Sequence, residues 1–271
     1  SASMCTAALL RRPGHDWPLI LASNRDEMKG RPWQAPGRHW PDRPEVVGGL
    51  DELSGGSWAG VNDWGVVAVI LNRYGSLGSD AEKRSRGELV LEALDHAEAR
   101  EAAKALRDLE PSTYRSFNLI VADAREGYWL RNLGTAETPH GGPAEAVEVQ
   151  ALPDGLSLIN AGDLNTESDL RVKRYFDAFK AAPAPDPGTG EWSAWTRLLA
   201  DRSQDPEWGP ISAACFMQDN GFGTLSSSLI ALPAPPQTLD AEPRPAEYLF
   251  APGPPSDTPH RPVEAVGRTG R

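Results

Sequence analysis

The fold is decided near the N-terminus by the stretch Leu19-Ile20-Leu21-Ala22-Ser23-Asn24-Arg25-Asp26-Glu27, which follows the run Cys5-Thr6-Ala7-Ala8-Leu9-Leu10. Both stretches are largely apolar, and the turn signal Pro13-Gly14 between them predicts a hairpin of two antiparallel strands. If Leu10 pairs near Leu19 across a loop of residues 11–18, the register places Cys5 opposite Asn24. In that register Asn24 and Asp26 share a face with Cys5 and Arg25 points away, whereas a slip of one residue would reverse the facing.

Other short apolar segments between turn residues predict further strands at residues 58–61, 66–71, 117–122, 128–131, 147–152, 156–159, 215–216, 225–232 and 248–250. Apolar residues at three- and four-residue spacing predict helices over 84–109, from 170 to 179 and around 192–199. The glycine pairs at 48–49 and 55–56 are read as hairpin turns rather than a phosphate-binding loop. Blocks of strands and helices, without regular alternation, predict an α+β fold of two antiparallel sheets packed together and covered by helices.

Composition excludes several classes of partner. The chain has 271 residues and a net charge of −11, which disfavours broad contact with nucleic acids or anionic membranes. It has two cysteines, no apolar run long enough to span a bilayer and no leader pattern, so we expect a cytoplasmic protein without a disulfide framework. The five histidines are widely separated, which predicts no metal site and no resident cofactor.

A single domain is expected over residues 1–271, and the two ends of this range are interpreted separately. Residues 1–3 precede Met4, and we interpret them as a remnant of cloning, with Met4 as the natural initiator. Removal of Met4 would leave Cys5 as the first residue. The segment 252–271 is rich in proline, glycine and charge, and is predicted to be a flexible tail.

A cysteine at a free N-terminus has the groups needed for amide hydrolysis. Its α-amine and its thiol have ordinary pKa values of about 8 and about 8.5, so the amine can accept the thiol proton. A nearby arginine favours the thiolate, an aspartate can orient the amine, and asparagine amides can donate hydrogen bonds to an oxyanion. The alternative is structural, since a cysteine at the start of a strand is most often a small buried side chain and a polar run after a strand is most often a turn.

The ordered motifs of the chain resemble those of the NRDE family, which includes transport-and-Golgi-organisation protein 2. The motifs are Met4-Cys5-Thr6, Asn24-Arg25-Asp26-Glu27, Arg31-Pro32, Gly55-Gly56-Ser57-Trp58, Asn72-Arg73, Arg86-Gly87-Glu88-Leu89, Phe117-Asn118-Leu119, Leu158-Ile159-Asn160-Ala161 and Gly223-Thr224-Leu225-Ser226-Ser227. The family fold resembles the four-layer αββα sandwich of N-terminal-nucleophile (Ntn) hydrolases. Within that fold, penicillin V acylases and conjugated bile acid hydrolases use an N-terminal cysteine.

The resemblance implies roles for individual residues. Cys5 would be the nucleophile and carry the base, Asp26 would orient it, and Arg25 would contact charge or substrate. Asn72 and Asn160 would stabilise the oxyanion or position groups. Four further residues are expected to contact the ligand: Asn24, Glu27, Arg31 and Trp58.

One position departs from the family pattern. Where the family usually reads Gly-Thr-Arg-Ser-Ser, this chain has Leu225 in place of the arginine. The missing guanidinium would weaken turnover unless Arg25, Arg73 or Arg171 supplies the charge.

Two functions therefore follow from the sequence. The first is a cysteine amidohydrolase acting on a non-peptide C–N bond with Cys5 as N-terminal nucleophile. The alternative is a non-enzymatic binding or trafficking protein for an apolar ligand such as haem or acyl-coenzyme A, for which nine tryptophans could provide contacts.

Overall fold

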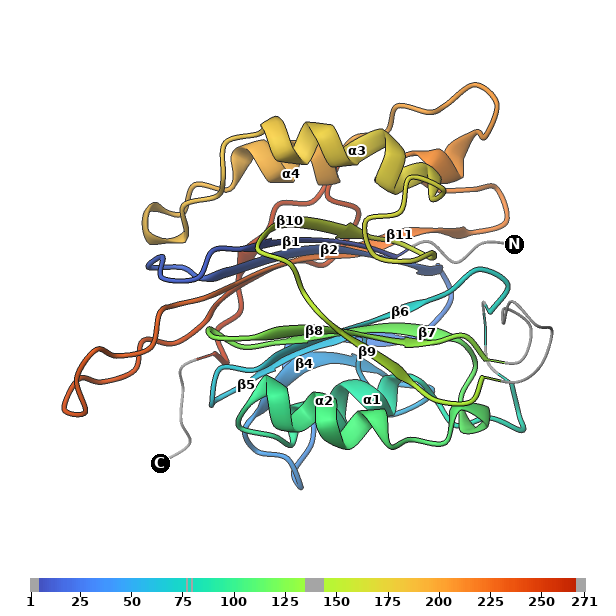
Figure 1. Ribbon diagram of the computed structural model, residues 1–271. Helices are drawn as coiled ribbons and strands as arrows, with labels where there is room; N and C mark the ends of the chain where they lie inside the picture. Colours follow the sequence, from blue (N-terminus) through green and yellow to red (C-terminus); the bar gives the residue numbers. More distant parts are fainter. Residues whose placement is uncertain (1–4, 77, 79, 135–143, 267–271) are drawn as a thin grey trace. The chain divides into compact units, whose positions relative to one another are not determined.

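The computed structural model describes residues 5–76, 78, 80–134 and 144–266 (Figure 1). The expected cloning remnant and Met4 lie outside these residues. The chain divides into two compact units. We call them the Cys5 unit (Met4–Arg31 and Pro153–Val263) and the central unit (Pro32–Leu152 and the residues from Glu264).

The Cys5 unit contains a six-stranded antiparallel sheet with strand order β10-β1-β2-β11-β12-β13. The strands are β1 (Thr6–Arg11), β2 (Leu19–Met28), β10 (Gly155–Ile159), β11 (Phe222–Leu232), β12 (Glu247–Ala251) and β13 (Arg261–Pro262). Helices α3 (Leu170–Ala181) and α4 (Ser193–Leu199) pack on one face of the sheet. Alternate residues of each strand face the helices and form the apolar core between sheet and helices. Examples are Ala8 of β1 and Ile20 and Ala22 of β2.

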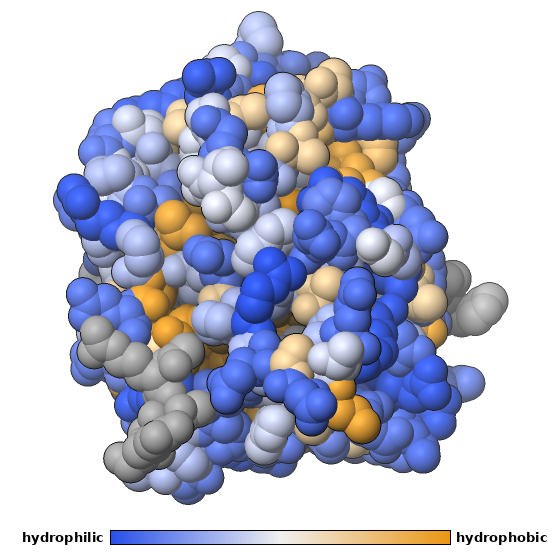
Figure 2. Space-filling model, turned by 90° about the vertical axis from the view of Figure 1, so that its left-hand side faces the viewer, coloured by the Kyte–Doolittle hydropathy of each residue, from blue (hydrophilic) through white to orange (hydrophobic). Residues whose placement is uncertain are grey.

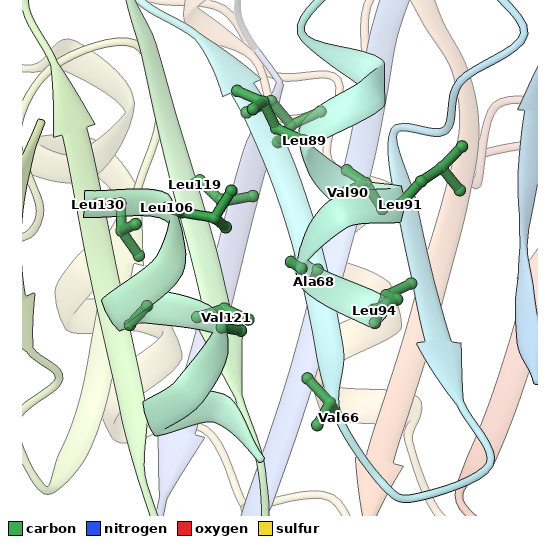
Figure 3. Close-up of a cluster of buried hydrophobic side chains, with 14 of the residues drawn as sticks. Val66, Ala68, Leu89, Val90, Leu91, Leu94, Leu106, Leu119, Val121 and Leu130 are labelled. Carbon is green, nitrogen blue, oxygen red and sulfur yellow. The ribbon is translucent and has the colours of Figure 1, made fainter. Parts of the chain in front are cut away.

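The central unit contains a seven-stranded antiparallel sheet in sequence order from β3 to β9. Its strands are β3 (Trp33–Gly37), β4 (Val46–Asp51), β5 (Ala59–Asn62), β6 (Val67–Asn72), β7 (Phe117–Ala122), β8 (Gly127–Asn132) and β9 (Glu148–Ala151). Helices α1 (Gly87–Leu94) and α2 (Ala99–Arg107) cover one face. Figure 3 shows Leu106 of α2 beside Leu119 of β7, and the leucines of α1 around Ala68 of β6; all of them belong to one buried apolar cluster. The expected α+β class, with two antiparallel sheets that each carry helices, is confirmed.

The predicted helix over 84–109 is two helices. α1 ends at Leu94, where the side-chain amide of Asn62 donates to the main-chain oxygens of Leu94 and His96 at 3.0 and 2.8 Å. α2 begins at Ala99, whose N–H donates to the Asp123 carboxylate at 2.9 Å. Apolar spacing continues through the break because both helices bury the same kind of face, so periodicity alone does not locate it.

Three other predictions need correction. Gly48 and Gly49 lie inside β4 rather than in a turn, and a Cβ on Gly49 would meet the Trp58 ring at 2.2 Å. Residues 215–216 lie outside the strands, since the chain there forms only the isolated bridge from Met217 to Gly223. Part of the predicted flexible tail is ordered, because β13 pairs with β12 through the main chain, which requires no apolar periodicity.

The exposed large hydrophobic side chains are scattered among hydrophilic ones. Figure 2 shows several small hydrophobic areas on one face of the molecule. The most exposed large apolar side chain is Leu239, in the loop that joins β11 to β12. None of the helices within the described ranges is long and apolar enough to cross a membrane.

Candidate active site

The hairpin of β1 and β2 has a register one residue away from the predicted one. Leu10 pairs with Ile20 rather than Leu19, and Thr6 pairs with Asn24. The N–H of Arg12 donates to the Pro18 oxygen at 2.8 Å and closes the loop one residue later than the sequence suggested. Continuing the register by one residue places Cys5 opposite Arg25.

This shift reverses the predicted facing of the site residues. The side chains of Asn24 and Asp26 point to the helix-covered face, since Asn24 contacts Leu199 of α4 and Asp26 contacts Arg171 of α3. Strand alternation therefore puts Arg25 and Cys5 together on the opposite face. The proximity of Cys5 to the 24–27 cluster was predicted correctly, but the assignment of Asn24 and Asp26 to its face was wrong.

Cys5 contacts the main chain of Asp26 rather than its carboxylate. The Asp26 N–H donates to Cys5 Sγ at 3.4 Å, and Sγ lies 3.6 Å from the Asp26 carbonyl oxygen. Burial and the negative charge of Asp26 raise the pKa of the Cys5 thiol to about 12, against the opposing effects of the Asp26 N–H and the Arg25 charge. With this pKa the thiol is protonated at neutral pH.

The carboxylate of Asp26 is the centre of a buried network on the helix-covered face. Arg171 donates to Oδ2 at 2.8 Å and the Thr224 hydroxyl donates to Oδ1 at 2.8 Å. Both side chains of the ion pair are fully buried. Burial raises the pKa of Asp26, and the Arg171 charge and the two hydrogen bonds oppose that increase.

Asn160 is linked to this network through the first turn of α3. Its side-chain amide donates to Asp169 Oδ1 at 3.1 Å, and Asp169 caps the helix by accepting the N–H groups of Arg171 and Val172. Asp169 also accepts the N–H of Gly162 through Oδ2 at 3.1 Å. Asn160 thus fixes the start of the helix that carries Arg171, on the face opposite Cys5.

The position of Leu225 is a β-bulge in β11. The pairing with β2 shifts between Thr224, which faces Asp26, and Ser226, which faces Arg25, so Leu225 is the extra residue. The guanidinium that reaches Asp26 comes from Arg171, one of the three arginines considered as charge donors. Of the other two, Arg25 faces away from the Asp26 carboxylate, and Arg73 belongs to the central unit, where it donates to Asn118 at 2.8 Å.

The four predicted ligand contacts and the predicted catalytic residue Asn72 are distributed over both units. Glu27 and Arg31 form a loose pair at 3.9 Å just beyond the β2 cluster. Asn24 donates to the carbonyl oxygens of Leu199 and Ala214 at 2.9 and 3.0 Å, which makes it a helix-end cap. In the central unit, Trp58 packs edge-on against Trp33 and Asn72 pairs with Phe117 at the end of β6.

Three residues of the network were not assigned a role from sequence: Thr6, Thr224 and Asp169. Thr224 stood within a quoted motif, but its contact with Asp26 depends on strand pairing 198 residues away. Asp169 carried a local signal, because an aspartate directly before an apolar helical pattern is a typical N-cap. Across the described residues, no group of three or more His, Cys, Asp or Glu side chains is placed to hold a metal ion.

The arrangement of strands and helices identifies the class of fold through its similarity to solved structures. The chain is similar in fold to the Caenorhabditis elegans ortholog of N-acylethanolamine-hydrolyzing acid amidase, with 16% identity, a TM-score of 0.54 and coverage of 87% of this chain and 96% of that one. It also resembles penicillin V acylase from Agrobacterium tumefaciens (13% identity, TM-score 0.45, 92% and 83% covered). A mutant conjugated bile acid hydrolase from Clostridium perfringens matches at 10% identity, TM-score 0.47, with 96% and 97% covered. The match to the amidase ortholog, at a TM-score of 0.54, confirms the Ntn-hydrolase-like fold.

The family model described as Transport and Golgi organisation 2 matches residues 4–233. The chain belongs to this family, as the NRDE motifs indicated. In a comparison with curated proteins, no sequence matches the chain.

Proposed function

We propose that the protein is an Ntn-type cysteine amidohydrolase that hydrolyses a non-peptide amide bond with Cys5 as its nucleophile. The observation that carries this proposal is the contact of Cys5 Sγ with the Asp26 N–H, at the edge of a fully buried Asp26–Arg171 pair. A buried charge network costs free energy to desolvate, and such networks cluster at functional sites. The chain is similar in fold to an amidase that hydrolyses N-acylethanolamines, which are linear amides. This similarity supports a linear acyl amide as the substrate.

The proposed reaction needs Cys5 as the first residue, after removal of Met4. The free α-amine accepts the thiol proton, and the thiolate attacks the amide carbonyl carbon to give a tetrahedral intermediate. The C–N bond then breaks as the ammonium returns the proton to the leaving amine, which leaves a thioester on Cys5. Water adds to the thioester as the amine takes its proton, the C–S bond breaks, and the ammonium returns the proton to sulfur, which releases the carboxylic acid and regenerates the Cys5 thiol.

The other predicted catalytic residues take roles set by their facing. Arg25 shares the face of Cys5, so its charge favours the thiolate or binds an anionic part of the substrate. Asp26 and Asn160 act from the opposite face as positioning residues, since their side chains contact Arg171 and Asp169. Asn72 belongs to the central unit, and its role as an oxyanion donor stays a prediction from the sequence.

The chemistry explains why removal of Met4 matters. With Met4 in place, burial and Asp26 keep the pKa of the thiol near 12, and the chain has no amine at Cys5. A free ammonium on Cys5 adds a positive charge next to the sulfur and lowers that pKa, and its neutral form is a base that operates near pH 8.

The test compares protein that begins at Cys5 with protein that retains one extra residue before it. Both are incubated with a panel of N-acyl amides, and acyl-enzyme is detected by intact mass together with released amine. We expect thioester and turnover only in protein beginning at Cys5, and neither in its Cys5→Ala variant. Equal turnover by both starting forms would exclude the α-amine as base, and turnover by Cys5→Ala would exclude Cys5.

We propose as the second candidate function the binding of an acyl chain, favoured by a groove of about 480 Å³ in the Cys5 unit. Trp192, Leu229 and Leu249 line it together with Arg197, and its volume suits a small ligand. Haem fits less well, because the groove imidazole, His260, has its Nε2 enclosed. Tryptophan fluorescence titration with acyl-coenzyme A and with haem should show saturable acyl-coenzyme A binding that Arg197→Ala weakens and Arg25→Ala does not. A cytoplasmic location is proposed for either function.

A further inference from the structure

Arg171 is the most enclosed cation of the Cys5 unit, and it contacts three separate segments. It is fully buried, and its Nη1 donates to Asp26 Oδ2 at 2.8 Å and to the Thr6 hydroxyl at 2.9 Å. Its Nε donates to the Ile211 carbonyl oxygen at 2.9 Å. The guanidinium carbon lies 5.0 Å from the centre of the Phe216 ring. Arg171 thus joins β2, the start of β1 and the 211–216 segment to α3.

Two of these partners are the residues that hold Cys5. Thr6 follows Cys5 in the chain, so a fixed Thr6 side chain limits the movement of the Cys5 main chain. Asp26 supplies the N–H that reaches Cys5 Sγ at 3.4 Å. Although Arg171 lies on the face opposite Cys5, it therefore restrains both main-chain segments that place the thiol.

Arg171 is itself held in place from its own main chain. Asp169 accepts the Arg171 N–H at 3.0 Å, and Asn160 steadies Asp169 from the end of β10. Because the helix start is fixed, the long side chain reaches the sheet from a defined point. A planar guanidinium can donate in several directions at once, which the single ammonium of lysine cannot reproduce with the same geometry.

We infer that Arg171 is a positioning residue for the Cys5 thiol, acting through the sheet by holding Asp26 and Thr6. This inference rests on the proposed function of Cys5 as nucleophile, but it concerns the state of the thiol before any substrate binds. The charged groups that act on the Cys5 sulfur are Asp26 and Glu27, which oppose the thiolate, and Arg25, which favours it. Arg171 forms an ion pair with Asp26, which has the larger effect of the two opposing charges.

The test measures alkylation of Cys5 by iodoacetamide in the full-length folded chain at several pH values between 8 and 10. Peptide mass spectrometry separates Cys5 from Cys215, which is buried. The variants are Arg171→Gln, Arg171→Lys, and the double variant Asp26→Asn with Arg171→Gln. The matched control is Arg174→Gln, about one turn further along helix α3. Arg174 donates to the main-chain oxygens of Ser203 and Ser212, on a segment away from Asp26 and Thr6.

We expect the rate for Arg171→Gln to fall about tenfold or more, since an unneutralised carboxylate close to the sulfur opposes the thiolate. Arg171→Lys should recover part of the rate because it retains the charge. The double variant should exceed Arg171→Gln, because the opposing charge is gone. Arg174→Gln should match wild type.

Three results would overturn the inference: a wild-type profile in folded Arg171→Gln, an equal fall in Arg174→Gln, or a double variant as slow as the single one. If Arg171→Gln does not fold, the lysine variant decides, and a wild-type alkylation rate in that variant would overturn the inference. If the alkylation rates follow the expected pattern but the protein hydrolyses no amide, the proposed function is rejected and the inference about Arg171 stands.

Discussion

The helix-covered faces of the two sheets differ in what they bury. In the central unit the face under α1 and α2 is a continuous apolar cluster from Val66 to Leu130 (Figure 3). In the Cys5 unit the face under α3 and α4 is apolar around Ile20 and Ala22 but ends in the Asp26–Arg171 pair. Burial of apolar side chains is enough to hold helices on a sheet. Packing of the helices therefore does not require the buried Asp26–Arg171 pair. The difference lies at the end of β2, beside the proposed site.

The largest expected effect comes from breaking the buried pair. Arg171→Met should lower the free energy of unfolding by about 3–5 kcal/mol, because it leaves the Asp26 carboxylate buried without its cation. The matched control is Arg43→Met in the central unit, whose ion pair with Asp95 has the same 2.8 Å distance but is partly exposed. That variant should cost less than about 1 kcal/mol. Equal costs in urea unfolding would contradict the distinction between the two faces.

The next effect tests the apolar face of the central unit. Leu119→Ala removes a fully buried side chain from β7 and should cost about 3 kcal/mol in the same urea experiment. The rate of Cys5 alkylation under native conditions should stay at the wild-type value, since Leu119 contributes packing only. A changed alkylation rate in the folded variant would show that the two units share the site network.

A smaller effect compares two asparagines that cap helix ends from a sheet. Asn24 donates to the carbonyl oxygens of Leu199 and Ala214, and Asn62 donates to those of Leu94 and His96. Replacement by alanine should cost about 1–3 kcal/mol at either position, since buried acceptors lose their donor. Asn62→Ala should cost more, because Asn62 also accepts the Val66 N–H at 2.9 Å. A larger loss for Asn24→Ala in thermal unfolding would reverse this ranking.

The smallest effect is the pH dependence caused by Cys5. Its pKa is about 12 in the folded protein and about 9 when unperturbed, so the stabilisation is complete below pH 9 and is lost as pH rises toward 12. The loss attributable to Cys5 between pH 8 and pH 10 should be about 1 kcal/mol. Tyrosines titrate in the same range, so the measurement is the difference between wild type and Cys5→Ser. Parallel pH curves for the two proteins would show that the thiol pKa is not raised.

Much of the fold and the neighbourhood of the site could be predicted from local sequence. Alternating and periodic apolar residues located most strands and helices, and the hairpin brought Cys5 to the 24–27 cluster. The facing of Asn24, Arg25 and Asp26 could not be predicted, because side-chain period in a strand is two and the loop was misjudged by one residue. The register depends on one hydrogen bond, in which the Arg12 N–H rather than the Arg11 N–H closes the loop. Amino-acid composition does not specify which residue makes that bond.

The hydrogen-bond network around Asp26 was harder to predict from sequence than the facing of the strand residues. Thr224 and Arg171 reach Asp26 from 198 and 145 residues away, so their contacts depend on tertiary packing. The departure at Leu225 drew attention to a missing charge, and the guanidinium that reaches Asp26 comes from Arg171 on helix α3. Gly49 was missed as a strand residue because its role is to leave room for the Trp58 ring, which only the packed structure reveals.

The exposed loop between β11 and β12 has a practical use in protein engineering. If catalysis requires Cys5 to begin the chain, affinity tags and fusion partners cannot be placed ahead of it. The loop joins two adjacent strands of one hairpin, and Leu239 near its tip is fully exposed. Insertions are tolerated best at such tips, where the main chain has few buried contacts. A tag inserted beside Leu239 would allow purification and surface attachment while leaving the amino terminus to the cell's own processing enzymes.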